Sequence, residues 1–175
     1  MITITESGMT FGPFDPDRVF RIEESAFLRG KQLKACEFVW LTPQDSLLLI
    51  EAKSSVPNPH TFPKEYDEFF TSIFEKLDNS LQILAAGLLE RHNELTHQMG
   101  PMTRVTPLGP ERRIMLYLVI PEMPDEYLPP FSDKLASVLK RQGQIWRAEV
   151  KVINKRVPNT SYPSSSKPRP ASMVS

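Results

Sequence analysis

The chain has 175 residues, and its 21 Lys and Arg side chains balance 21 Asp and Glu side chains, so the formal net charge is zero. This length fits a single domain with a substantial hydrophobic core. The neutral balance argues against a large basic surface for sequence-independent nucleic-acid binding. The single cysteine, Cys36, excludes an internal disulfide and suits a reducing compartment. No apolar segment reaches membrane-spanning length, and the first residues lack the pattern of a secretory signal. We therefore expect a cytoplasmic protein that does not contact membranes.

The first third of the chain predicts β-structure on both sides of a helix. Residues 1–14 are rich in β-forming residues and interrupted by Gly and Pro, which indicates a short strand or arm. Asp15 to Arg29 is predicted as a helix, because Asp15 can cap it and Pro16 suits the first helical position. The segments KACEFVWLT (34–42) and SLLLIEAKSS (46–55), separated by PQD, predict a β-hairpin.

The remainder predicts helices that alternate with strands. Apolar residues recur at helical spacing from Phe70 to Leu88, which predicts one long amphipathic helix that ends near Gly100. The apolar run at 112–120 is typical of a strand covered on both faces. A further helix is expected from Ser132 to about Arg141, with Gly143 just beyond its end.

The segment at 144–154 is predicted as the last strand. The predicted order α-β-β-α-β-α-β favours an α/β fold with a mixed β-sheet flanked by helices. We expect one domain over residues 1–157. Residues 158–175 are rich in Pro and Ser and predict a flexible tail.

Charged residues in the predicted hairpin are the strongest functional signal. Glu51 and Lys53 follow four apolar residues in one strand and, because side chains alternate, point to the same face. A turn of three residues, Pro43 to Asp45, would place Glu37 of the preceding strand directly opposite Glu51. A five-residue loop gives the same pairing, and an even-numbered loop turns Glu37 to the other face.

Two opposed carboxylates destabilise a strand pair unless a cation lies between them. Mg²⁺ is a hard ion that binds one or two carboxylates together with water. Such an ion can activate water and stabilise charge on a phosphoryl oxygen, and Lys53 is positioned to orient the water or to neutralise charge. Glu37, Glu51 and Lys53 are therefore the candidate catalytic residues, with Mg²⁺ or Mn²⁺ as the cofactor.

The stretch CEFVWLTPQDSLLLIEAKSS resembles the core hairpin of the PD-(D/E)xK nuclease superfamily, which has the restriction-endonuclease-like fold. Glu51-Ala52-Lys53 matches the (D/E)-x-K element, and Glu37 stands where the family usually has Asp. The resemblance implies metal-dependent cleavage of nucleic acid, which is DNA or, less often, RNA. It also implies Glu37, Glu51 and the Ala52 carbonyl as metal ligands, and one further core strand, for which residues 1–14 are the candidate.

The family commonly adds an acidic residue from a helix before the hairpin. Glu23 or Glu24 can supply it, and Glu23 is favoured because its helical neighbours at three and four residues are apolar. A homodimer or a larger protein partner is compatible with this interpretation.

Two other interpretations stay open. The neutral charge and the missing Asp suit a catalytically inactive protein of the same fold that serves as a protein-binding or scaffold subunit. In an unrelated α/β domain, Glu51 and Lys53 would form only a solvated ion pair, and Glu37 would pair with Lys34 or Lys53.

Overall fold

The structure, a computed structural model, describes residues 1–100, 102 and 112–154 of the chain. Its α/β fold is built on a mixed five-stranded sheet in the order β3-β4-β5-β6-β7. These strands are β3 (Val19–Phe20), β4 (Phe38–Leu41), β5 (Leu47–Ala52), β6 (Ile114–Val119) and β7 (Glu149–Ile153). Strand β4 is antiparallel to β3 and β5, whereas β6 is parallel to β5 and β7. The predicted mixed sheet is confirmed.

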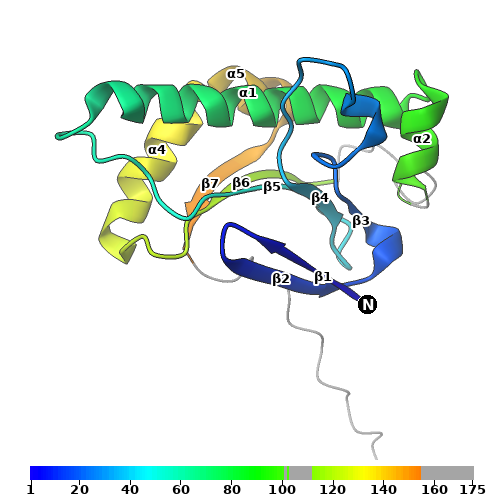
Figure 1. Ribbon diagram of the computed structural model, residues 1–175, viewed down its shortest axis with the longest axis horizontal. Helices are drawn as coiled ribbons and strands as arrows, with labels where there is room; N and C mark the ends of the chain where they lie inside the picture. The colour runs from blue at the N-terminus through cyan, green and yellow to red at the C-terminus, as the bar shows by residue number, and fades with distance from the viewer. Residues whose placement is uncertain (101, 103–111, 155–175) are drawn as a thin grey trace, which may run out of the picture.

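The two faces of this sheet are covered differently (Figure 1). The long helix α1 (Pro63–Leu88) lies along one face, and α2 (Asn93–Met99) follows it. On the same side, α4 (Leu128–Val138) and α5 (Lys140–Trp146) connect β6 to β7. A separate hairpin of β1 (Ile2–Glu6) and β2 (Met9–Phe14) lies against the other face. The three layers are therefore helices, sheet and hairpin.

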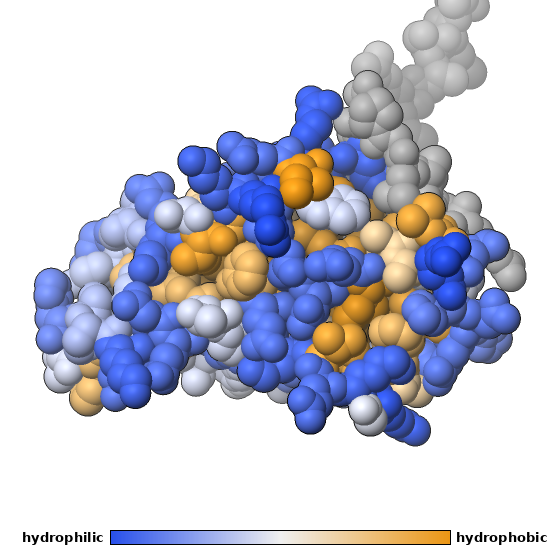
Figure 2. All heavy atoms as spheres, turned by 90° about the horizontal axis from the view of Figure 1, so that it is seen from above, coloured by the Kyte–Doolittle hydropathy of each residue, from blue (hydrophilic) through white to orange (hydrophobic). Residues whose placement is uncertain are grey.

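Alternating side chains of the central strands supply both halves of the core. In β5, Leu47 and Leu49 face the helical layer, whereas Leu48 and Ile50 pack with the hairpin. All six residues of β5 are buried, which accounts for its nearly continuous apolar sequence. The outer face of the helical layer is mostly hydrophilic, with separate small apolar patches (Figure 2). Helix α1 therefore directs one apolar face inward and a polar face to solvent.

The predicted hairpin forms with the predicted register. β4 and β5 pair from Leu41 opposite Leu47 to Phe38 opposite Ile50. The Thr42 N–H donates to the Ser46 carbonyl at 2.9 Å, which leaves residues 43–45 at the tip. Asp45 has a φ of 59°, as a three-residue hairpin loop requires at the position that is usually Gly.

The predicted helix over Asp15–Arg29 is wrong. Asp15 does cap a helical turn by accepting a hydrogen bond from the Asp17 N–H, but that turn is a 3₁₀ turn of only three residues, Pro16–Arg18. The chain then pairs with β4 as β3, and a second 3₁₀ turn covers Ala26–Leu28. Pairing with the otherwise open edge of β4 outweighs the local helical preference. The additional strand of the sheet is thus β3, not residues 1–14.

The long helix predicted up to Gly100 is also interrupted. Helix α1 ends at Leu88, and α2 folds back against it after four residues. The predicted helix at Ser132–Arg141 consists of two helices, α4 and α5, and Gly143 lies inside α5 rather than beyond a helix end. The last strand begins at Glu149, because α5 takes the start of the predicted segment.

The predicted tail at 158–175, together with residues 155–157, lies outside the described residues. Within the described part of the chain, no helix combines the length and the apolar character needed to cross a membrane.

Candidate functional site

Charged side chains from four segments converge at the carboxyl end of β5, beneath α1. We call Glu23, Glu37, Glu51, Lys53 and Lys76 the charged cluster. The Lys76 ammonium lies at its centre, 3.0 Å from Glu51 Oε1, 3.0 Å from Glu23 Oε1 and 3.8 Å from Glu37 Oε1. Lys53 Nζ lies 2.7 Å from Glu51 Oε1. The structure thus brings Glu37, Glu51 and Lys53 together, as the sequence predicts, and adds Lys76, which is not among the predicted site residues.

The hairpin places the two carboxylates on the face that α1 covers. Glu51 is the fifth residue of β5 and is completely buried. Glu37 directly precedes β4, and its N–H donates to the Ile50 carbonyl at 3.0 Å. Because Lys76 of α1 contacts both carboxylates, they lie on the same side of the sheet.

A buried hydroxyl fixes the position of α1 relative to Glu37. Ser80, one turn after Lys76, donates to the Lys76 carbonyl at 2.7 Å and accepts a hydrogen bond from the Cys36 N–H at 2.8 Å. Its side chain therefore links the turn of α1 that carries Lys76 to the residue before Glu37. This bridge positions two members of the cluster without touching their charged groups.

Glu23 and Glu24 occupy different surroundings, although neither lies on the predicted helix. Glu23 lies between β3 and the second 3₁₀ turn and accepts a hydrogen bond from Lys76 at 3.0 Å. Glu24 pairs with Arg21 at 2.8 Å, and Arg21 also binds Glu6 at 2.6 Å. Glu23 is therefore the one of the two that joins the cluster.

The Ala52 carbonyl, an expected metal ligand, accepts a hydrogen bond from Ser7 Oγ at 2.9 Å. Ser7 has a φ of 51° and forms the turn between β1 and β2 with Gly8, whose φ is 77°. The hairpin on the far face of the sheet thus reaches the end of β5. A carbonyl oxygen has two lone pairs, so this bond leaves one acceptor position.

The cluster opens to solvent on one side. The side chains of Glu23 and Lys53 are 44% and 32% exposed, whereas that of Glu51 is completely buried. A ligand can thus reach Lys53 and Glu23 from outside, while Glu37 and Glu51 form the floor of the site.

Burial and crowding of like charges shift the protonation equilibria in the cluster. The pKa of Glu37 is raised to about 8 by its burial, by a hydrogen bond with the Glu23 carboxyl and by the charge of Glu51. The same hydrogen bond lowers the pKa of Glu23, with a further contribution from Lys76. Burial opposes the charged form of Lys76, but its contacts with Glu51 and Glu23 outweigh this and raise the pKa of the ammonium. The cluster therefore holds one carboxyl group more than its two ammonium groups can balance.

Comparisons of the chain with family models, with curated proteins and with solved structures give no match. Function must therefore be argued from the geometry. Within the described residues, no group of three or more His, Cys, Asp or Glu side chains is arranged as a metal site. In the charged cluster, an ammonium lies at the point on which the carboxylates converge.

Lys76 is the member of the charged cluster that the sequence patterns above do not identify. The signal was present, because Lys76 and Ser80 lie on the same helix face as the core residues Ile73, Leu77 and Leu81. A charged residue inside an apolar stripe requires a partner. The same criterion selected Glu23, and applied to the long helix it would have selected Lys76.

Proposed function

We propose that the chain hydrolyses phosphodiester bonds in nucleic acid, DNA rather than RNA, with a divalent metal ion held by the charged cluster. The observation that supports this most is that Glu37 and Glu51, from two paired segments, both contact Lys76, while Lys53 contacts Glu51 at the partly exposed side of the same cluster. The supporting fold features are the antiparallel pair β4-β5, the helix α1 after it, and the parallel strands β6 and β7. This is the order implied by a PD-(D/E)xK, restriction-endonuclease-like fold, except that a strand replaces its first helix.

The donor groups have the chemistry that a hard divalent ion takes, although the carboxylates would have to move closer together to ligate one. Carboxylate oxygens of Glu23, Glu37 and Glu51 lie 3.0–3.8 Å from a single point, the Lys76 nitrogen, and oxygen is the ligand that Mg²⁺ and Mn²⁺ take in proteins. The surplus carboxyl group, evident in the raised pKa of Glu37, provides charge for a cation to neutralise. For an ion to enter, the Lys76 ammonium must move aside and Glu37 must release its proton.

Each residue then has a role. Glu37 and Glu51 would hold Mg²⁺ or Mn²⁺, with the free lone pair of the Ala52 carbonyl and the Glu23 carboxylate as further ligands. A bound divalent ion supplies Lewis-acid stabilisation of charge on a phosphoryl oxygen. Lys53, partly exposed and held at 2.7 Å from Glu51, orients the attacking water or neutralises the developing charge.

The test is cleavage of plasmid and single-stranded DNA in Mg²⁺ or Mn²⁺, with EDTA as the reference. Glu51→Gln and Lys53→Ala should each reduce cleavage at least about a hundredfold. The control variants Glu68→Gln and Lys64→Ala change exposed residues of α1 and should cut like the wild type. Cleavage that survives both cluster substitutions would contradict the proposal.

A second candidate has its own support. Lys76 lies where the metal would be, and Ser7 occupies one acceptor position of the Ala52 carbonyl. Both contacts suit a protein of the same fold that has lost metal chemistry and serves as a protein-binding or scaffold subunit. This candidate predicts that neither Mg²⁺ nor Mn²⁺ raises the melting temperature, and that the chain forms a homodimer or co-purifies with a larger protein.

A further inference from the structure

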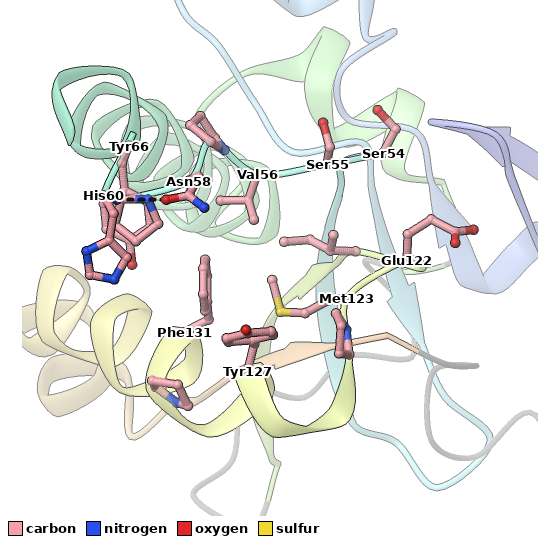
Figure 3. Close-up of a pocket in the computed structure, with 15 residues that line it drawn as sticks. Ser54, Ser55, Val56, Asn58, His60, Tyr66, Glu122, Met123, Tyr127 and Phe131 are labelled. Carbon is pink, nitrogen blue, oxygen red and sulfur yellow. Dashed lines mark hydrogen bonds between the residues drawn. The ribbon is translucent and has the colours of Figure 1, made fainter. Parts of the chain in front are cut away.

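A cavity of about 550 Å³ lies at the carboxyl ends of β5 and β6 (Figure 3), and two of its lining residues directly follow Lys53 of the charged cluster. Its apolar walls are formed by Val56, Tyr66, Ile120, Met123, Tyr127 and Phe131. We propose that this cavity binds an unpaired nucleobase of the DNA strand whose phosphate lies at the charged cluster. This inference rests on the proposed function and names the part of the substrate that the cavity recognises.

The cavity and the charged cluster are continuous along the chain and across the sheet. Ser54 and Ser55, which line the cavity, directly follow Lys53. The Lys53 N–H donates to the Val119 carbonyl at 2.9 Å, and Ile120, the residue directly after β6, lines the cavity.

Helix α1 spans both sites. Tyr66 borders the cavity, and Lys76 lies ten residues further along the same helix, about 15 Å away at 1.5 Å per residue. A bound DNA strand must therefore span about this distance between its phosphate at Lys53 and its base in the cavity.

The walls offer rings for stacking. Tyr66 and Phe131 meet edge to face, with ring centroids 5.7 Å apart, and this contact holds the two rings in place. Tyr127 also lines the cavity and is 52% exposed, so its ring is available to a ligand. Stacking on an aromatic ring is how proteins hold single-stranded bases without strong sequence preference.

One polar group can read the edge of a base. Asn58 Oδ1 accepts hydrogen bonds from the N–H groups of His60 and Thr61, which fixes the amide. Its nitrogen points toward the cavity (Figure 3) and can donate to a base carbonyl. A volume of about 550 Å³ lies within the range of small-molecule sites. Such a cavity takes one base that is out of its stack, not a duplex.

The test is fluorescence anisotropy with labelled (dT)₁₅ and with a fully abasic strand of the same length, in EDTA so that no cleavage occurs. Tyr127→Ala should weaken (dT)₁₅ binding about tenfold and leave abasic binding unchanged. Tyr127→Phe keeps the ring and should bind like the wild type. The control Ile145→Ala changes an exposed residue of α5 and should have no effect.

Three results would overturn the inference: equal (dT)₁₅ affinity for the wild type and Tyr127→Ala, an equal loss for the abasic strand, or tighter binding of a duplex than of the single strand. Cleavage measurements separate this inference from the proposed function. If the wild type cuts DNA and Tyr127→Ala still binds normally, only the base site is wrong. If Tyr127→Ala loses (dT)₁₅ binding and no metal supports cleavage, the base site stands and hydrolysis is wrong.

Discussion

Protonation of Glu37 sets the net charge of the cluster. When Glu37 carries a proton, the charges of Glu23 and Glu51 balance those of Lys53 and Lys76. Above its pKa of about 8 the cluster gains an unbalanced negative charge in a largely buried place. Release of this proton is therefore unfavourable unless a cation enters, and cation binding is coupled to pH.

This coupling predicts a pH-dependent stability that Glu37→Gln removes. The folded pKa of about 8 lies above the ordinary value of 4.5, so the folded protein keeps a proton that the unfolded chain has released. The stabilisation is therefore complete below about pH 4.5 and is lost progressively as the pH rises to about 8. We expect Glu37→Gln to match the wild type near pH 4 and to exceed its free energy of unfolding by about 4–5 kcal/mol near pH 9.

Urea unfolding of both proteins across this pH range, without divalent ions, measures the difference. Glu94→Gln changes an exposed carboxylate in the first turn of α2 and serves as the control. A difference between Glu37→Gln and wild type that does not change with pH would contradict the assignment.

Removal of the Lys76 ammonium is expected to destabilise the fold, whereas Glu37→Gln stabilises it at high pH. Loss of the ammonium leaves the fully buried Glu51 with Lys53 as its remaining cationic partner, and an uncompensated buried charge is costly. We expect Lys76→Met to lower the free energy of unfolding by about 3 kcal/mol near neutral pH. Lys64→Met, on the exposed start of the same helix, should change it by less than about 0.5 kcal/mol.

The same variant tests whether the cluster can hold a metal ion. With the ammonium gone, Mg²⁺ or Mn²⁺ can occupy its place, so the melting temperature of Lys76→Met should rise with added metal more than that of the wild type. An equal response of the two proteins would indicate that the ion binds elsewhere or not at all.

At the scale of elements, the helix ends were the least predictable part of the fold. Helix α1 ends with the Arg91 N–H donating to the Ala86 carbonyl and the Glu90 N–H to the Gly87 carbonyl. This is a Schellman motif with Glu90 at a φ of 53°. Helix α5 likewise ends at Arg147, with a φ of 50°. Gly is the usual residue at such positions. A prediction that places helix ends at Gly therefore misses the ends of both α1 and α5.

Contacts between α1 and α2 explain why the chain turns at that point. Leu95 and Met99 of α2 are buried against Gly87, and Thr96 donates to the Gly87 carbonyl at 3.0 Å. A Cβ atom at Gly87 would lie 2.1 Å from Met99 Sδ and 3.2 Å from Leu95 Cγ. At Gly143 of α5, in contrast, the nearest atom would be at an ordinary 3.6 Å.

These two glycines give a matched prediction. Gly87→Ala should lower the free energy of unfolding by about 1–2 kcal/mol, because the steric cost of overpacking exceeds the gain in helix propensity. Gly143→Ala should raise it by about 0.5–1 kcal/mol, because only the propensity gain applies. Thermal or urea unfolding of the two variants checks the signs, and a stabilising Gly87→Ala would show that α2 does not pack closely on α1.

The hairpin and its charges were predictable for a physical reason. The alternation of side chains and the odd length of the turn fix which face Glu37 and Glu51 share, and neither depends on the rest of the fold. Glu23 and Lys76 reach the same point only through tertiary packing, because Glu23 lies in a bend and Lys76 lies on α1, 25 residues beyond Glu51 in the sequence. Local patterns therefore gave the strand residues of the site, and the structure was needed for the others.

On the scale of the whole molecule, the sheet is stabilised from both faces. Phe11 and Phe14 of the β1-β2 hairpin pack on the ring of Phe38, with ring centroids 5.3 and 5.6 Å apart, and Phe14 also meets Trp40 at 5.0 Å. The opposite sides of the same strands carry the core beneath α1. Loss of either cover exposes apolar side chains of the central strands, so we expect the hairpin and the helical layer to unfold together.

Phe14→Ala tests this coupling. Phe14 is almost completely buried, and its truncation should lower the free energy of unfolding by about 3–4 kcal/mol. Thr3→Ala, at an exposed position of β1, should cost less than about 0.5 kcal/mol.

In a Trp146→Phe background, fluorescence reports Trp40 beneath the hairpin, and far-ultraviolet circular dichroism reports the helices. The two urea transitions should coincide in Phe14→Ala, because the strands beneath the hairpin are the strands beneath α1. A fluorescence transition that precedes the loss of helix would mean that the hairpin detaches on its own. Ser7 would then leave the Ala52 carbonyl while the charged cluster remains folded.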